Sequence, residues 1–137
     1  MITALTVAAE SGVDVRIITP HIPDKWYVHA VSRSYYRQLI DSGVRIYEYT
    51  PGFIHGKMFV ADDEVATVGT VNMDYRSFYF HFECGVWMCS VPAVDDIKEH
   101  FEEMQAESNE IILSKWSKRP LRKRFMQALL NVFAPFM

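Results

Sequence analysis

Two apolar segments on either side of Asp62-Asp63 place the tightest limit on how this chain can fold. Residues 53–61 and 64–71 are rich in β-branched and aromatic residues, and the pair of aspartates between them predicts a β-hairpin that turns at Asp62-Asp63. Around this hairpin the sequence predicts further strands over 13–19, 44–49 and 82–89, and helices over 2–11, 25–42 and 92–107. The alternation of strands and helices predicts an α/β fold, with a mixed sheet flanked by helices.

The start of the chain is unusual for such a fold. A helix over residues 2–11 directly precedes the buried strand over 13–19, and no strand comes before the helix to pair with it. At 137 residues the chain is long enough for one domain. We therefore expect a truncated fragment of a larger fold.

The predicted hairpin brings four polar side chains to one face. Pairing about its turn sets Lys57 opposite Val68 and His55 opposite Thr70. Because side chains alternate across a strand, His55, Lys57, Thr70 and Asn72 then share a face. Burying such groups without a partner costs about 1–3 kcal/mol each. A bound phosphate would satisfy all four.

These residue types suit chemistry at phosphorus. The imidazole of His55 can attack a phosphorus atom or, when protonated, can protonate a leaving alkoxide. The Lys57 ammonium and the Asn72 amide can stabilise charge on the phosphate oxygens. No cluster of carboxylates accompanies these residues in the sequence, so we expect neither a metal site nor another cofactor.

Three more residues belong to the same stretch. Glu83 is out of place in the apolar segment 82–89 unless it is paired. It can accept the second N–H of a histidine and fix the tautomer of that ring; the alternative is a structural ion pair, for example with Arg76. Asp62 lies at the turn and is expected to be structural, and Gly69 is expected on the opposite face, where it permits close backbone packing.

Charge divides the chain into two parts. Residues 1–114 hold 8 Lys and Arg against 17 Asp and Glu, whereas residues 115–137 hold 6 Lys and Arg and no acid. We expect a domain over 1–114 and a basic, amphipathic tail over 115–137 that either binds an anionic bilayer or packs on protein. Nucleic acid is not an expected partner, because few aromatic residues are interleaved with these charges.

The spacing from His55 to Asn72, H-x-K-x4-D-x6-G-T-x-N, resembles the signature of the phospholipase D superfamily. The chain resembles more closely the C-terminal part of bacterial cardiolipin synthases. That resemblance lies in residues 11–16, 32–36, 42–47, 66–78 and 118–120, which read SGVDVR, SRSYY, SGVRIY, ATVGTVNMDYRSF and KRP. It implies a phospholipase D-like fold in which this chain is one half of a pseudo-twofold, two-lobed protein.

The resemblance also implies a reaction. Two such motifs form one site, where one histidine takes the phosphatidyl group from phosphatidylglycerol and the other acts as general acid and base, giving cardiolipin and glycerol. His55 corresponds to the acid and base, Lys57, Thr70 and Asn72 to the phosphate-binding positions, and Glu83 to the carboxylate that orients the histidine. The full-length protein would lie in the bacterial cytoplasmic membrane.

We expect the isolated chain to be inactive without its N-terminal half or a second copy, and to be soluble or peripheral on the cytoplasmic face. Two alternatives remain open. One is a single-motif phosphodiesterase or nuclease that acts as a homodimer. The other is an inactive fragment that only binds lipid.

Overall fold

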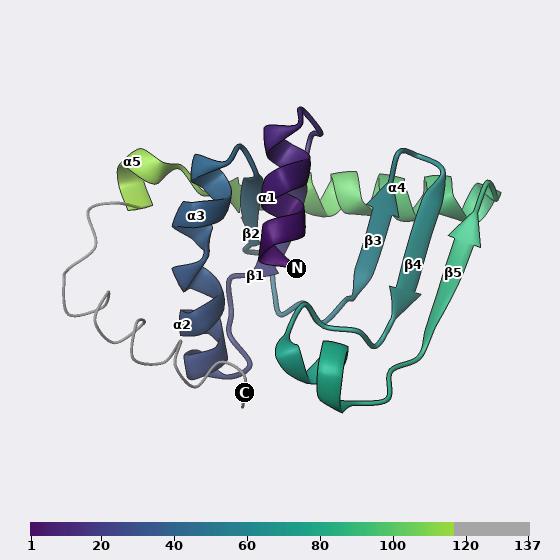
Figure 1. The fold of residues 1–137 in the computed structure, drawn as a ribbon, viewed down its shortest axis with the longest axis horizontal. Helices are drawn as coiled ribbons and strands as arrows, with labels where there is room; N and C mark the ends of the chain where they lie inside the picture. Colours follow the sequence, from purple (N-terminus) through teal and green to yellow (C-terminus); the bar gives the residue numbers. More distant parts are fainter. Residues whose placement is uncertain (117–137) are drawn as a thin grey trace.

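The computed structural model describes residues 1–116. Apart from its first two residues, the predicted basic tail lies outside this range. Figure 1 shows a mixed α/β arrangement, as the strand and helix alternation predicts. In chain order its elements are α1 (Ile2–Glu10), β1 (Arg16–Pro20), α2 (Trp26–Ser34), α3 (Tyr36–Asp41), β2 (Arg45–Tyr49), β3 (Met58–Ala61), β4 (Val65–Gly69), η1 (Arg76–Phe80), β5 (Gly85–Cys89), α4 (Pro92–Ala106), β6 (Ser108–Glu110) and α5 (Leu113–Trp116).

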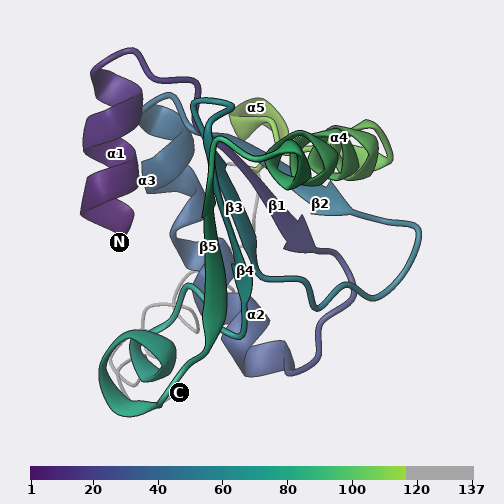
Figure 2. The ribbon, with the colours of Figure 1, turned by 90° about the vertical axis from the view of Figure 1, so that its right-hand side faces the viewer.

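The strands form two open sheets flanked by helices, one mixed, as the sequence predicts, and one antiparallel. In the first sheet β1 runs parallel to β2, and the short strand β6 adds antiparallel to β2. The second sheet is an antiparallel meander with the order β3-β4-β5. The long helix α4 runs across strands of both sheets (Figures 1 and 2). It therefore holds the two sheets together.

The hydrophobic core lies in the first of these sheets. Ile46 and Val44, at the start of β2, have 0% and 1% of their surface exposed, and they pack with Tyr36 and Leu39 of α3. Helix α1 packs against α3. This sheet and its helices form the most densely buried part of the described chain.

The predicted helix over 25–42 is in fact two helices, α2 and α3, which meet at Tyr35. The hydroxyl of Ser34 donates to the carbonyl oxygen of Val31 at 2.5 Å, and the hydroxyl of Ser32 donates to that of Val28 at 3.0 Å. Serine hydroxyls that bond to the preceding turn compete with the helical backbone pattern and bend helices. The bend allows α3 to present Tyr36 and Leu39 to the core.

The hairpin forms at the predicted place, with a longer turn. Residue 61 lies opposite residue 65, so the loop has three residues, 62–64, instead of two. Asp62 and Asp63 have φ angles of 55° and 57°. This left-handed region is one that aspartate adopts more readily than most residues.

The longer turn shifts the register of the hairpin by one residue. The predicted pairings of Lys57 with Val68 and of His55 with Thr70 are therefore wrong. The carbonyl oxygen of Lys57 instead accepts the backbone N–H of Gly69 at 3.1 Å. Gly69 thus lies directly across from Lys57 rather than on the opposite face, and the alternation argument for one shared polar face no longer holds.

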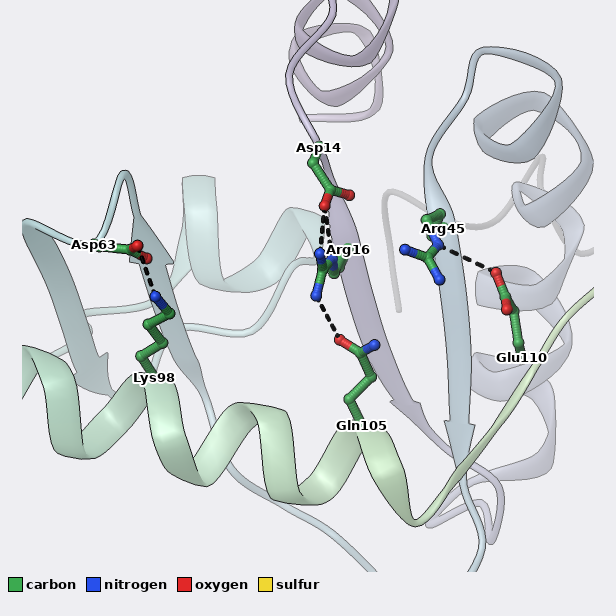
Figure 3. A network of polar contacts seen from close by, with 7 residues as sticks. All are labelled: Asp14, Arg16, Arg45, Asp63, Lys98, Gln105 and Glu110. Carbon is green, nitrogen blue, oxygen red and sulfur yellow. Dashed lines mark hydrogen bonds and ion pairs between the residues drawn. The ribbon is translucent and has the colours of Figure 1, made fainter.

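Polar contacts fix α4 to both sheets (Figure 3). Arg16 of β1 donates to Asp14 at 2.5 Å and to Gln105 of α4 at 3.3 Å. In the middle of α4, Lys98 binds Asp63 in the hairpin turn at 2.6 Å. Helix α4 therefore has polar contacts both to β1 and to the hairpin turn.

Candidate functional site

The predicted site residues lie along one edge of the molecule. The connection from β2 to β3 carries His55 and Lys57, Thr70 follows β4, and Glu83 precedes β5. Figures 1 and 2 place these strand ends at one edge, beside η1 and at the opposite end of the strands from α4. We call this the site edge. The structure therefore gathers residues from three segments of the sequence.

Thr70 and Glu83 form the best-defined contact at this edge. The Thr70 hydroxyl donates a short hydrogen bond to Glu83 Oε2 and accepts the backbone N–H of Cys84 at 3.0 Å. The Thr70 backbone N–H donates to the Cys84 carbonyl oxygen at 2.9 Å. Thr70 is thus fixed toward β5, because its backbone and its side chain both bond to residues that lead into that strand.

The carboxylate of Glu83 is stabilised in its charged form. Hydrogen bonds from the hydroxyls of Thr70 and Ser77 lower its pKa below the ordinary value of 4.5, and His81 and Lys57 act more weakly in the same direction. Lys57 thus lies within electrostatic range of Glu83, although its ammonium donates to the His55 carbonyl oxygen and not to this carboxylate.

Ser77 belongs to this cluster and was not predicted from the sequence. It is buried, and its hydroxyl accepts the backbone N–H of Asn72 at 3.1 Å while bonding to Glu83. Its own N–H donates to the carboxylate of Asp74 at 2.8 Å. An aspartate three residues before a serine is a local capping pattern that could have pointed to this turn.

His55 is exposed and accessible. Its ring stacks on Phe53 with 6.0 Å between the ring centroids and 16° between the planes. The ammonium of Lys57 donates to the carbonyl oxygen of His55 at 2.9 Å. Within residues 1–116 neither imidazole nitrogen has a hydrogen-bond partner, so the ring is open to a ligand.

Glu83 and His55 are not joined in this structure. The expected hydrogen bond between them is replaced by the two hydroxyl bonds to Glu83. The alternative ion pair with Arg76 is also absent among the described residues, because the Arg76 guanidinium donates to Nε2 of His81 at 3.1 Å. The role of Glu83 in orienting a histidine stays a prediction.

The remaining motif residues have clear positions. Asp62 lies in the turn, away from the site edge, in agreement with a structural role. A Cβ atom on Gly69 would come within 2.6 Å of the Gly85 Cα and would also overlap the Cys84 carbonyl oxygen. Gly69 therefore permits close approach of β4 and β5, as the sequence predicts. The Asn72 side chain is exposed next to this cluster.

The described residues offer little to a metal ion. No group of three His, Cys, Asp or Glu side chains within residues 1–116 is arranged to bind one. What the site edge offers is a cation, hydroxyl and amide donors, a carboxylate and an exposed imidazole. In residues 1–116 no helix is both long enough and apolar enough to cross a bilayer.

Comparisons with known proteins agree on one family. A family model described as "Cardiolipin synthase, PLD-like domain" matches residues 1–105. Cardiolipin synthase 2 of Bacillus anthracis is 38% identical over the whole chain, and the cardiolipin synthase of Geobacillus thermodenitrificans is 39% identical over the whole chain. A protein of Streptococcus mutans is 45% identical over 98% of the chain.

The fold also has a solved relative. Nuc from Salmonella typhimurium, a phospholipase D family member, superposes with a TM-score of 0.69 at 20% sequence identity, over 80% of this chain and 72% of that one. The matched relatives are much longer, since this chain spans 27% to 29% of their lengths. With the sequence match and the phospholipase D fold in agreement, the chain belongs to the cardiolipin synthase family of phospholipase D-like domains.

Proposed function

We propose that this chain supplies one half of a phosphatidyltransferase site that makes cardiolipin and glycerol from two molecules of phosphatidylglycerol. The observation that carries the proposal is the cluster at the site edge, where Lys57, Thr70 and Glu83 gather beside the exposed imidazole of His55. A second histidine motif completes the site. It comes from another segment or a second copy.

In the first step, the histidine of the other motif attacks the phosphorus of phosphatidylglycerol. A nitrogen–phosphorus bond forms and the bond from phosphorus to the glycerol oxygen breaks. His55, as imidazolium, gives its proton to that oxygen, so that glycerol leaves neutral. Its imidazole nitrogens have no hydrogen-bond partner among the described residues, so no hydrogen bond within residues 1–116 has to be broken first.

In the second step, neutral His55 removes a proton from a hydroxyl of the incoming phosphatidylglycerol. The oxygen attacks phosphorus, the nitrogen–phosphorus bond breaks, and cardiolipin is released with His55 protonated again. One imidazole can serve both steps because an imidazole ring can both donate and accept a proton. The step that returns the proton therefore resets the site.

We assign the phosphate oxygens to Lys57, Thr70 and Asn72. Lys57 supplies the positive charge and Asn72 an amide donor. The Thr70 hydroxyl donates its one hydrogen to Glu83 in this structure, so it binds the phosphate only after that hydrogen turns from the carboxylate toward the ligand. Glu83 is the positioning residue of the group, through the hydroxyls that it holds and the nearby charge of Lys57.

The test is to assay the purified chain on phosphatidylglycerol vesicles, alone and with a co-expressed polypeptide that carries a second histidine motif. We expect cardiolipin only from the combination, and none when His55→Ala replaces the wild type. His100→Ala is the matched control, because His100 is an exposed histidine on α4 at the opposite end of the strands. Full turnover by His55→Ala would refute the assignment.

The products separate this proposal from its alternatives. Phosphatidic acid in place of cardiolipin, formed by a dimer of this chain, would indicate a single-motif phosphodiesterase. Vesicle binding with no product in any combination would indicate a lipid-binding fragment. Cardiolipin made by the chain as a monomer would contradict the idea that it holds half a site.

A further inference from the structure

We propose that an exposed aromatic segment next to the site inserts into the interfacial region of an anionic phospholipid bilayer. This insertion would keep the site edge at the membrane surface. We call this segment the aromatic rim. It consists of Met73, Tyr75, Phe78, Tyr79, Phe80 and Phe82, in and around η1. The inference rests on the proposed function for its substrate, and it assigns a membrane contact to six side chains that have no role in the proposed reaction.

Each of the six rim side chains is at least 41% exposed. Tyr79 and Phe80 are 75% and 68% exposed, and Phe82 is fully exposed. Single apolar residues are common on protein surfaces, but a contiguous patch usually marks a binding surface. We therefore interpret the rim as a binding surface.

The residue types indicate a membrane surface. Phenylalanine rings suit the acyl region, and tyrosines prefer the boundary between hydrocarbon and water because one end is apolar and the other forms hydrogen bonds. Tyr75 and Tyr79 stack with 6.2 Å between ring centroids and 28° between planes, which makes a stiff apolar edge. Arg76 lies between them in the sequence and offers a cation at headgroup depth.

Charge favours the same orientation. Helix α4 contains five Asp and Glu residues and one Lys, whereas residues 73–82 contain one acid, Asp74, and one arginine, Arg76. In Figures 1 and 2 these two segments lie at opposite ends of the β3-β4-β5 strands. An anionic membrane repels the acidic helix α4 but not residues 73–82, whose charges nearly balance. The protein should therefore approach the membrane with the rim facing it.

The base of the rim is part of the site. Ser77 points inward from η1 and bonds to the Asn72 backbone and to Glu83. A rim anchored in this way brings Asn72 and Glu83 to the bilayer surface, where a phospholipid phosphate lies. The lipid would then need to leave the bilayer only slightly to reach His55.

Nucleic acid fits this surface poorly. Stacking of bases on aromatic rings is accompanied by a cationic groove that follows the phosphates. Residues 1–114 hold 8 Lys and Arg against 17 Asp and Glu, and the rim has a single arginine. A second copy of the chain remains the main competing occupant, and the experiments distinguish it.

The first experiment measures depth. Phe80→Trp and His100→Trp place an added indole on the rim and on α4, at two exposed positions. With phosphatidylglycerol vesicles that contain brominated acyl chains, Phe80→Trp should gain quenching over the wild-type chain, and His100→Trp should gain none. Equal quenching of the two added indoles, or none at position 80, would overturn the inference.

The second experiment measures binding. In sedimentation with phosphatidylglycerol vesicles, Tyr79→Ser/Phe80→Ser should lower the partition coefficient by about tenfold or more, because two large apolar surfaces no longer enter the bilayer. Val13→Ser/Val91→Ser is the control, since Val13 and Val91 are 52% and 42% exposed and lie outside the rim, before β1 and α4, and this variant should bind as the wild type does. Unchanged binding by the double variant would overturn the inference.

A second copy at the rim would give a different result. The double variant would then dissociate a dimer, detected by light scattering, and still bind vesicles, which also overturns the inference. His55→Ala separates the two proposals, because it should bind vesicles as the wild type does. If the wild-type chain, combined with a second motif, made no cardiolipin but still bound vesicles through the rim, only the proposed function would be refuted.

Discussion

The two sheets of this protein differ in how their polar residues are held. In the β1-β2-β6 sheet Glu48 is 2% exposed and is bound by Arg33 at 2.8 Å and by Nδ1 of His21 at 3.0 Å. In the β3-β4-β5 sheet the carboxylate of Glu83 is held by hydroxyls at an open edge. The carboxylate in the first sheet is buried and depends on its partners, whereas the carboxylate in the second is exposed and accessible at the site edge.

The largest test of this contrast is Glu48→Ala. Removal of Glu48 breaks its hydrogen bonds to Arg33 and His21, whose side chains are 26% and 53% exposed, so we expect a loss of about 1.5–3 kcal/mol in the free energy of unfolding. Glu110→Ala is the control, because Glu110 pairs with Arg45 on the surface at 3.3 Å and should cost less than about 1 kcal/mol. Urea denaturation measures both. Equal losses of unfolding free energy in the two variants would show that burial does not make the Glu48 contacts more important for stability than the surface pair.

Gly69→Ala tests the second sheet where it is most crowded. The added Cβ would overlap backbone atoms of Cys84 and Gly85, which cannot move independently of β5. We expect a loss of about 1–3 kcal/mol, typical of overpacking. Gly52→Ala is the control, because a Cβ at Gly52 would meet no atom within 4 Å. A neutral Gly69→Ala would mean that β4 and β5 separate easily.

The charge of Glu83 gives a pH-dependent test. Its pKa in the folded state lies below 4.5, so its contribution to stability is fully present above about pH 4.5 and is lost as the pH falls through the lower, folded value. Thr70→Val removes the main hydrogen bond and should raise the folded pKa toward 4.5. An NMR titration of the Glu83 carboxyl measures the change. Thr67→Val, earlier on β4, should leave that pKa where it is.

The smallest expected effect is at the contact between α4 and the hairpin turn. Lys98→Ala removes an exposed ion pair with Asp63, so we expect a loss of less than about 1 kcal/mol that shrinks at high salt. Denaturation at low and high salt checks it. A large loss that salt does not change would show that α4 supports the hairpin through this contact more than through packing.

The sequence predicted the structure most accurately at residues that strongly favour one backbone conformation, such as glycine and proline at helix ends. Gly12 and Gly43 end their helices with φ angles of 94° and 98°, and α4 begins at Pro92, as predicted. The family and the phospholipase D fold followed from the motif around His55 and Lys57 and are confirmed by the comparisons. The sequence also predicted that His55, Lys57 and Thr70 lie near one another, but it derived this from a hairpin register that is wrong by one residue.

Sequence reasoning failed where neighbours decide the outcome. The hairpin register depended on whether Asp62 and Asp63 made a two-residue turn or shared a three-residue loop, and aspartate is compatible with both. The sequence did not identify Ser77, because its role depends on hydrogen bonds to Asn72 and Glu83 that form only in the tertiary structure. Local patterns identified the elements, and long-range contacts set the details of the site.

The Ser77 hydroxyl has a consequence beyond geometry. One hydroxyl links η1, the backbone of Asn72 and the carboxylate of Glu83, so the opening of η1 and the protonation of Glu83 should be coupled. We expect protonation of Glu83 to weaken its bond to Ser77 and to make η1 open more often. The protection factors of the η1 amides, which correct for the intrinsic exchange rate, should therefore fall in acid.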